Sequence, residues 1–124
     1  MDACYCDYGD GPSVFDEKTV KARKAHKCSE CRGAILPGET YLKTWGIWDG
    51  EAQTFKRCVD CTSLMDWATA HVKCICWHYG QTLSDIIDAM QTYDAECPGL
   101  LAEAEAKVTS VRTTRRAALQ AATL

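Results

Sequence analysis

The sequence contains no run that approaches the roughly 18 apolar residues of a membrane-spanning helix. No basic segment followed by an apolar stretch opens the chain, so the form of a secretory leader is missing too. Cysteine, in contrast, is abundant, with nine among 124 residues. Without a leader or a membrane span, we expect a cytoplasmic protein with no membrane partner. Because disulfides are rare in the reducing cytosol, we expect its paired cysteines to bind metal.

The signatures of common catalytic sites are absent as well. Gly9 and Gly11 are too few for a phosphate-binding loop, and no βαβ pattern surrounds a CxxC pair as in thioredoxin-like proteins. Nucleases of the HNH type need a His-rich element, but residues 38–57, which have the pattern of a β-hairpin, contain no His. We therefore expect no enzymatic activity, no catalytic residue and no small-molecule substrate.

Charge is unevenly distributed along the chain, whose formal net charge is −3. Residues 1–17 carry five acids and no Lys or Arg, whereas residues 18–27 carry five cations and no acid. The cations of this basic run are Lys18, Lys21, Arg23, Lys24 and Lys27. Two interpretations stay open: the run contacts phosphates or an acidic partner, or its cations balance nearby thiolates and acids.

The strongest motif consists of two CxxC pairs, which supply Cys28, Cys31, Cys58 and Cys61. Each pair forms a knuckle whose sulfurs converge on one metal, and two pairs supply the four tetrahedral ligands of a structural zinc ion. Twenty-six residues separate the pairs, more than the roughly 15 to 20 that are usual. A catalytic zinc keeps one position open for water, so four cysteines predict an architectural metal.

The residues between the pairs explain this longer spacing. Asp49-Gly50 lies between two β-prone runs, which is a strong hairpin signal. After Cys61, residues at helical spacing follow: Leu64, Trp67, Ala68 and His71. A knuckle, a hairpin and a helix that begins with the second ligand pair predict an α+β fold with a small treble-clef-like zinc finger, in which the helix N-terminus favours the thiolates.

Two CxC pairs flank the finger and supply Cys4, Cys6, Cys74 and Cys76. We expect these outer cysteines to bind a second zinc ion, which would clamp the N-terminal segment onto the end of the finger helix. Each zinc with four thiolates is a −2 unit, so two sites would change the net charge from −3 to about −7. A chain this acidic attracts nucleic acid only through its local basic run.

The remaining potential ligands are two histidines and one cysteine. His71 or His78 could replace a thiolate of the outer site, since imidazole is an equally good zinc ligand. A packing role on the helix face is the simpler interpretation of His71. Cys97 precedes Pro98-Gly99 at a helix break, and we expect it to be a free thiol without a chemical role.

Two helices are predicted beyond the finger. The first has the apolar stripe Leu83, Ile86, Ile87 and Met90, with Thr82 or Ser84 as its N-cap. The second is rich in alanine and repeats Leu101, Ala104, Val108 and Val111. Three arrangements of the last helix stay open: it packs on residues 83–95 as a hairpin, it offers the face of a homo-oligomer, or it is a fraying, partly disordered tail.

The predicted boundaries follow from these elements. We expect a zinc-bound domain over residues 1–95, with the finger core at 23–73. The second zinc clamp within it comes from residues 1–17 and 74–80. A C-terminal helix over residues 96–124 completes the chain.

Alternation along the predicted hairpin separates its aromatic residues. Tyr41, Lys43 and Trp45 share one face with Ile47, whereas Trp48 lies on the opposite face. One face would pack on the finger helix, and the other is either packed too or a recognition surface. The candidate partner-binding residues are Tyr41, Trp45, Trp48, Arg23, Lys24 and Lys27.

The segment 22–61, which begins A-R-K-A-H-K-C-S-E-C and ends F-K-R-C-V-D-C, resembles a group of small, mostly uncharacterised Cys4 zinc-finger proteins encoded by tailed phages and prophages. The matching positions are Arg23, Lys24, His26, Cys28, Glu30, Cys31, Ile35, Pro37, Gly38, Glu39, Tyr41, Gly46, Trp48, Asp49, Gly50, Phe55, Cys58 and Cys61. The resemblance covers roughly residues 4–95. It implies a phage origin, the host cytosol as location and a structural zinc, but no established activity.

We therefore expect a zinc-stabilised phage-type accessory protein that binds and modulates a host macromolecule. The leading hypothesis is a host protein, such as a defence or regulatory complex, anchored by Tyr41, Trp45 and Trp48. The alternative is a DNA- or RNA-binding regulator that uses the basic run 18–27. In that case, the late arginines of the last helix would also contact phosphates: Arg112, Arg115 and Arg116.

Overall fold

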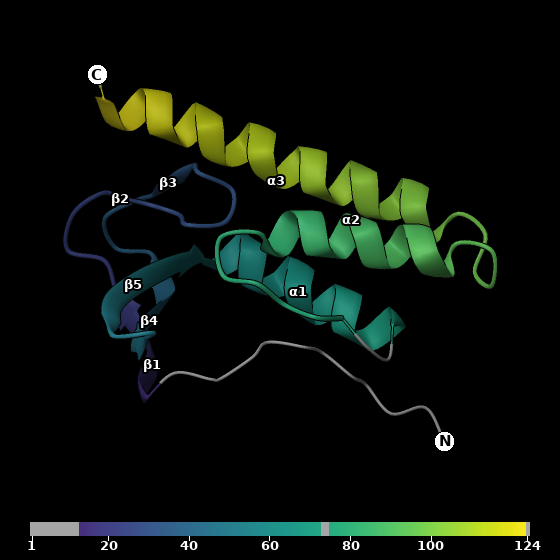
Figure 1. Ribbon diagram of the computed structural model, residues 1–124. Helices are drawn as coiled ribbons and strands as arrows, with labels where there is room; N and C mark the ends of the chain where they lie inside the picture. Colours follow the sequence, from purple (N-terminus) through teal and green to yellow (C-terminus); the bar gives the residue numbers. More distant parts are fainter. Residues whose placement is uncertain (1–12, 73–74, 124) are drawn as a thin grey trace.

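The computed structural model describes residues 13–72 and 75–123. Its elements are β1 (Val14–Lys21), β2 (His26–Lys27), β3 (Ala34–Ile35), β4 (Thr40–Trp48), β5 (Glu51–Cys58), α1 (Val59–His71), α2 (Thr82–Tyr93) and α3 (Leu100–Thr123). Figure 1 shows the three helices side by side, with the sheet at one end and the small β2–β3 hairpin between the sheet and α3. The expected α+β class is confirmed.

Strands β4 and β5 form the predicted hairpin. Asp49 and Gly50 occupy its turn with φ values of 51° and 81°, and Trp48 pairs with Glu51. Positive φ at both central residues is the geometry that matches the twist of the strands, and Gly and Asp adopt it readily. Strand β1 adds to the other edge of β4 and gives an antiparallel sheet of order β1-β4-β5. This third strand was not predicted from the sequence.

The two faces of this sheet have different surroundings. On the first, which we call the covered face, Thr44 is buried and Phe55 stacks on Tyr79 with ring centroids 4.8 Å apart. Because Tyr79 belongs to the segment between α1 and α2, that segment covers this face. The other, which we call the open face, carries Lys18, Lys43, Trp45 and Lys56.

The core lies among the helices and the cysteine-bearing loops. Ile35 from β3, Leu64 from α1 and Met90 from α2 are buried in one cluster with Ala104 and Val108 from α3. The C-terminal helix α3 therefore packs along α2 and onto β3 within the chain. Its packing on α2 is the predicted helical hairpin. No helix among the described residues is long and apolar enough to cross a membrane.

The start of α2 differs from the prediction. Its N-cap is Gln81, which makes no side-chain capping bond, so neither Thr82 nor Ser84 has that role. Instead, the Thr82 hydroxyl donates a hydrogen bond of 2.6 Å to the carboxylate of Glu30. Thr82, which the local sequence pattern predicted as the N-cap, therefore makes a tertiary hydrogen bond to Glu30 and does not cap the helix.

Candidate functional site

The two CxxC pairs come together in one buried cluster, which we call the cysteine tetrad. The four sulfurs lie within 4.8 Å of one another, and the Cys28–Cys61 and Cys31–Cys58 sulfurs are each 3.9 Å apart. Four Zn–S bonds of about 2.3 Å in a tetrahedron would place the sulfurs about 3.8 Å apart. All four cysteines are free of disulfides, so the tetrad is compatible with one metal ion such as zinc.

Backbone N–H groups point at the sulfurs and favour their negative charge. Cys58 is the N-cap of α1, and its sulfur accepts from the N–H of Cys61 at 3.4 Å. The sulfur of Cys28 accepts from the N–H groups of Glu30 and Cys58, also at 3.4 Å. The prediction that the helix start supports the thiolates is therefore confirmed.

Hydrogen bonds between the thiols shift their pKa values in different directions. The hydrogen bonds with Cys31, Cys58 and Cys61 lower the pKa of Cys28. The hydrogen bond to Cys28 is the largest cause that raises the pKa of Cys61, and it likewise raises the pKa of Cys58. A divalent cation at the centre would hold all four as thiolates, because its charge outweighs their mutual repulsion.

The first knuckle is fastened to two other parts of the chain. Ser29 exchanges hydrogen bonds with Lys56 of β5: the Ser29 N–H donates to the Lys56 carbonyl, and the Lys56 N–H donates to the Ser29 hydroxyl. The buried carboxylate of Glu30 accepts from the N–H of Gly80 as well as from Thr82. These contacts fix the tetrad against both the sheet and the segment before α2.

Arg115 holds the C-terminal helix on the knuckle. Its guanidinium donates to Asp60 at 2.8 Å, to Glu39 at 2.9 Å and to the carbonyl of Ala34 at 3.1 Å. The side chain is buried, and a Cβ on Gly33 would overlap the Arg115 Cβ, so the helix and the loop are in close contact. The prediction that Arg115 contacts phosphates is therefore wrong, because its side chain is buried and its Nε and Nη1 groups already donate within the molecule.

The predicted outer metal site lies mostly outside the described residues, since they do not include Cys4, Cys6 or Cys74. Cys76 is half-buried and disulfide-bonded in the structure. A disulfide sulfur is not the thiolate that a zinc site needs. The second zinc ion therefore stays a prediction, one that requires reduced Cys76.

The histidines and Cys97 have local surroundings of their own. The ring of His71 packs on Trp67, and its Nδ1 lies 2.8 Å from the Trp67 carbonyl oxygen. His78 contacts Asp85 through both its backbone N–H and its Nδ1. Cys97 is an exposed free thiol at the turn between α2 and α3.

The predicted aromatic anchors are split between the interior and the surface. Tyr41 is only 7% exposed and packs beside His26. Trp48 belongs to a cluster with Phe15, Phe55 and Tyr79 on and around the covered face. Of the three predicted aromatic anchors, Trp45 is therefore the one left for a partner to contact, since it is 38% exposed on the open face.

Three lysines from three strands form a row across the open face, which we call the lysine row. Lys18 of β1 pairs with Lys43 of β4, and Lys43 pairs with Lys56 of β5. Like charges directly opposite one another destabilise a sheet. No salt bridge within the described residues involves any of the three lysines.

The lysine row borders an open depression, which we call the basic groove. Its volume is about 880 Å³, and its lining residues are Lys18, Val20, Lys21, Ala22, Arg23, Lys24, His26, Tyr41 and Lys43. Burial lowers the pKa of His26, and the positive charges of Lys56, Lys24 and Lys43 lower it further. The ammonium of Lys56 lies 3.0 Å from the Nδ1 of His26, which can accept its hydrogen bond when neutral.

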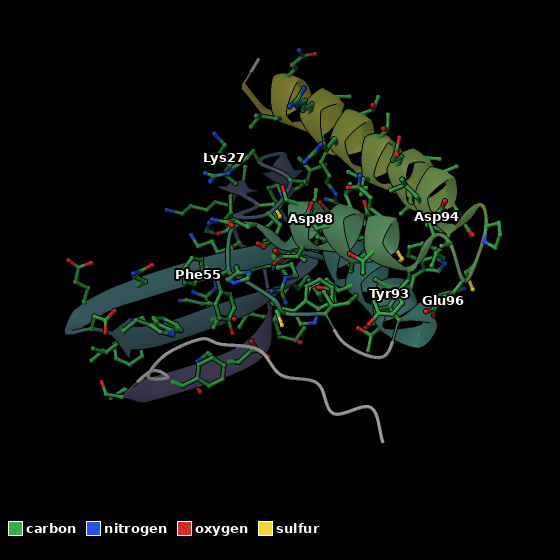
Figure 2. The ribbon with its side chains drawn as sticks, turned by 45° about the vertical axis from the view of Figure 1, so that its right-hand side comes forward. Lys27, Phe55, Asp88, Tyr93, Asp94 and Glu96 are labelled. Carbon is green, nitrogen blue, oxygen red and sulfur yellow. The ribbon has the colours of Figure 1, made fainter. Side chains whose placement is uncertain are left out.

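Two acidic residues lie far from the open face. Figure 2 shows Asp94 and Glu96 at the end of α2 that lies away from the sheet. Among the described acids, Asp16 lies on the open face, whereas Glu39 is bound to Arg115.

The predicted basic residues Arg23, Lys24 and Lys27 are all exposed. Arg23 and Lys24 line the basic groove. Lys43 lines it too, although the sequence did not predict this residue as part of the surface.

Comparison of the chain with protein-family models, with curated proteins and with solved structures found no match.

Proposed function

We propose that this chain is a zinc-stabilised, phage-type accessory protein whose open face binds the phosphate backbone of nucleic acid. We propose a binding module and no enzymatic activity. Zinc is the proposed metal because an all-thiolate tetrahedral set suits Zn²⁺ better than metals that prefer oxygen ligands. The order of knuckle, β4–β5 hairpin and an α1 capped by Cys58 supports a treble-clef-like arrangement.

The observation that carries the proposal is the lysine row. Three cations opposite one another on adjacent strands destabilise the fold, and no salt bridge among the described residues neutralises them. Residues whose placement lowers the stability of a fold are expected at functional sites, and the lysine row is such a placement. A polyanion lying across the open face would convert this repulsion into attraction.

The basic groove extends the same surface along β1. Five cations line it: Lys18, Lys21, Arg23, Lys24 and Lys43. A chain with a net charge of −3 has little long-range attraction to nucleic acid, so binding would depend on these short-range contacts. Because each contact releases counterions, the affinity should be strongly dependent on salt.

The host-protein hypothesis has lost much of its support. Two of its three aromatic anchors, Tyr41 and Trp48, pack against other side chains of the same molecule. Interfaces between proteins depend on such aromatic residues more than on lysine, which is depleted in them. Binding of an acidic partner protein is therefore the competing hypothesis, which the poly-glutamate measurement described below tests.

The test measures fluorescence anisotropy of labelled random-sequence DNA and RNA, both single- and double-stranded, at 50 mM salt. We expect binding of at least one nucleic acid, and five- to tenfold weaker binding by Lys43→Gln. Arg112→Gln is the matched control. The nucleic-acid hypothesis gave Arg112 a phosphate contact too, but the residue is exposed on α3 and does not line the basic groove, so under the present proposal this variant should bind like the wild type.

Two results would overturn the proposal. One is the absence of binding to every nucleic acid at 50 mM salt, where even weak phosphate contacts are detectable. The other is equal weakening by Lys43→Gln and Arg112→Gln, which would mean that net charge, and not the open face, determines the affinity.

A further inference from the structure

We infer that the open face prefers single-stranded to double-stranded nucleic acid, with Trp45 as the residue on which a base stacks. This inference rests on the proposed function, because it names the class of nucleic acid that the same surface binds. It starts from the position of Trp45 on β4, two residues beyond Lys43 on the same face.

Trp45 is the exposed aromatic beside the lysine row. No other aromatic ring lies against it among the described residues, unlike Trp48, which contacts three rings. Its cross-strand neighbours are Asp16 on β1 and Thr54 on β5. These neighbouring side chains are short, and Trp45 is 38% exposed, so part of its side chain is accessible to a ligand.

A smaller depression of about 240 Å³ joins Trp45 to the cations. Its lining consists of Asp16, Lys18, Lys43, Trp45 and Thr54, so it shares Lys18 and Lys43 with the basic groove. Residues two apart on a strand are separated by about 6.8 Å. A base on Trp45 would therefore have its own or a neighbouring phosphate within reach of Lys43.

Asp16 helps to distinguish the two parts of a nucleotide. Its carboxylate lies beside Trp45 at the end of this surface away from the knuckle. A phosphate would be repelled there, whereas the N–H groups on the edge of a base would find an acceptor. The charge pattern thus favours a base at Trp45 and phosphates along the lysine row.

The shape of the sheet argues against a duplex. A major groove about 12 Å wide admits a helix or a two-stranded ribbon, but Trp45 and Lys43 lie on the central strand of three. The outer strands are about 10 Å apart before side chains are added, so the sheet is too wide to enter. Lying flat on a duplex, the indole would meet the backbone, because paired bases are already stacked on one another.

Single strands present unstacked bases, and stacking on an aromatic side chain stabilises their complexes with little dependence on sequence. An exposed aromatic on a cationic sheet surface is the arrangement through which several single-strand binding modules act. The chemistry is common to single-stranded DNA and RNA. The experiment therefore includes both.

The test compares the dissociation constants of a labelled 12-nucleotide oligo(dT), the matching oligo(U) and a 12-base-pair duplex at 50 mM salt. We expect the wild type to bind one or both single strands at least tenfold more tightly than the duplex. Trp45→Ala should weaken single-strand binding roughly tenfold and leave duplex binding unchanged, whereas Trp45→Phe, which keeps a ring, should retain most of the preference. Val59→Ala, which trims an exposed apolar side chain on α1, is the control.

The outcomes separate this inference from the proposed function. If single strands and duplex bind equally, or Trp45→Ala has no effect while Lys43→Gln weakens binding, the stacking role is wrong and the phosphate-binding face remains. If no nucleic acid binds, both fail. Equally tight binding of poly-glutamate would show that the face recognises negative charge alone, and it would overturn the assignment of Trp45. Thermal melts of each variant confirm that the fold is intact.

Discussion

The cysteine tetrad and the lysine row are both clusters of like groups, but their surroundings are opposite. The four sulfurs are buried and spaced for one metal ion, and those of Cys28 and Cys58 accept N–H groups from the knuckle and from the start of α1. The three lysines lie on an open sheet face without a counter-ion among the described residues. The first cluster can be completed by one ion inside the molecule, whereas the second lies on the surface, where we propose that a polyanion would neutralise it.

Removing one sulfur should have the largest effect. We expect Cys58→Ser to lose the metal and most of the folded structure, because it removes one of the four thiolate ligands of the tetrad, while the Ser hydroxyl can still cap α1. Metal binding contributes about 10–16 kcal/mol in zinc-finger peptides, more than a small domain can spare. Far-UV circular dichroism and the zinc content of the purified protein measure the loss.

Cys97→Ser is the matched control for this prediction, since Cys97 is an exposed free thiol outside the tetrad. It should leave both the zinc content and the spectrum unchanged. A Cys58→Ser protein that stays folded with the wild-type zinc content would show that the tetrad is not the metal site.

Arg115 provides the next comparison, because it is a cation whose partners lie inside the chain. Arg115→Met should lower the free energy of unfolding by about 2–3 kcal/mol, since Glu39 and Asp60 lose their shared donor. The value is below that of a fully buried pair because both carboxylates are partly exposed. Urea denaturation measures it. The exposed Arg116→Met should change the free energy by less than about 0.5 kcal/mol, and an equal change in both variants would contradict the contacts described for Arg115.

Lys43→Thr should have the opposite sign and the smallest size. Removing the central charge of the lysine row should raise the free energy of unfolding by about 0.5 kcal/mol, because it relieves repulsion from both Lys18 and Lys56 and introduces a residue suited to strands. The same variant should bind nucleic acid more weakly. A variant that is less stable than the wild type would mean that Lys43 has a structural role.

Much of the metal centre could be predicted from the sequence because its determinants are local. CxxC spacing fixes which sulfurs meet, and Asp49-Gly50 fixes the turn of the hairpin. The α1 start at Cys58 follows from the same motif. The pairing of Lys43 with Lys56 could also be predicted from the sequence, because a two-residue turn at 49–50 sets the register of β4 and β5.

The rest depends on contacts between distant segments. Strand β1 places Lys18 beside Lys43, and no short-range signal sets that register. The surroundings of the buried Tyr41 and the half-buried Trp48 depend on His26 and on Tyr79, which come from other elements. Likewise, Arg115 lies about eighty residues from Ala34, whose carbonyl it binds, and its helical pattern alone gave no sign of that partner.

The salt dependence of single-strand binding tests most directly whether the open face binds phosphates. The five groove cations predict that log Kd for oligo(dT) rises with log salt with a slope of about 3.5, which is about 100-fold weaker binding at 200 mM than at 50 mM. Lys43→Gln should reduce this slope by about 0.7, and Arg112→Gln should leave it unchanged. A wild-type affinity that does not depend on salt, or the same slope in the wild type and Lys43→Gln, would contradict the account.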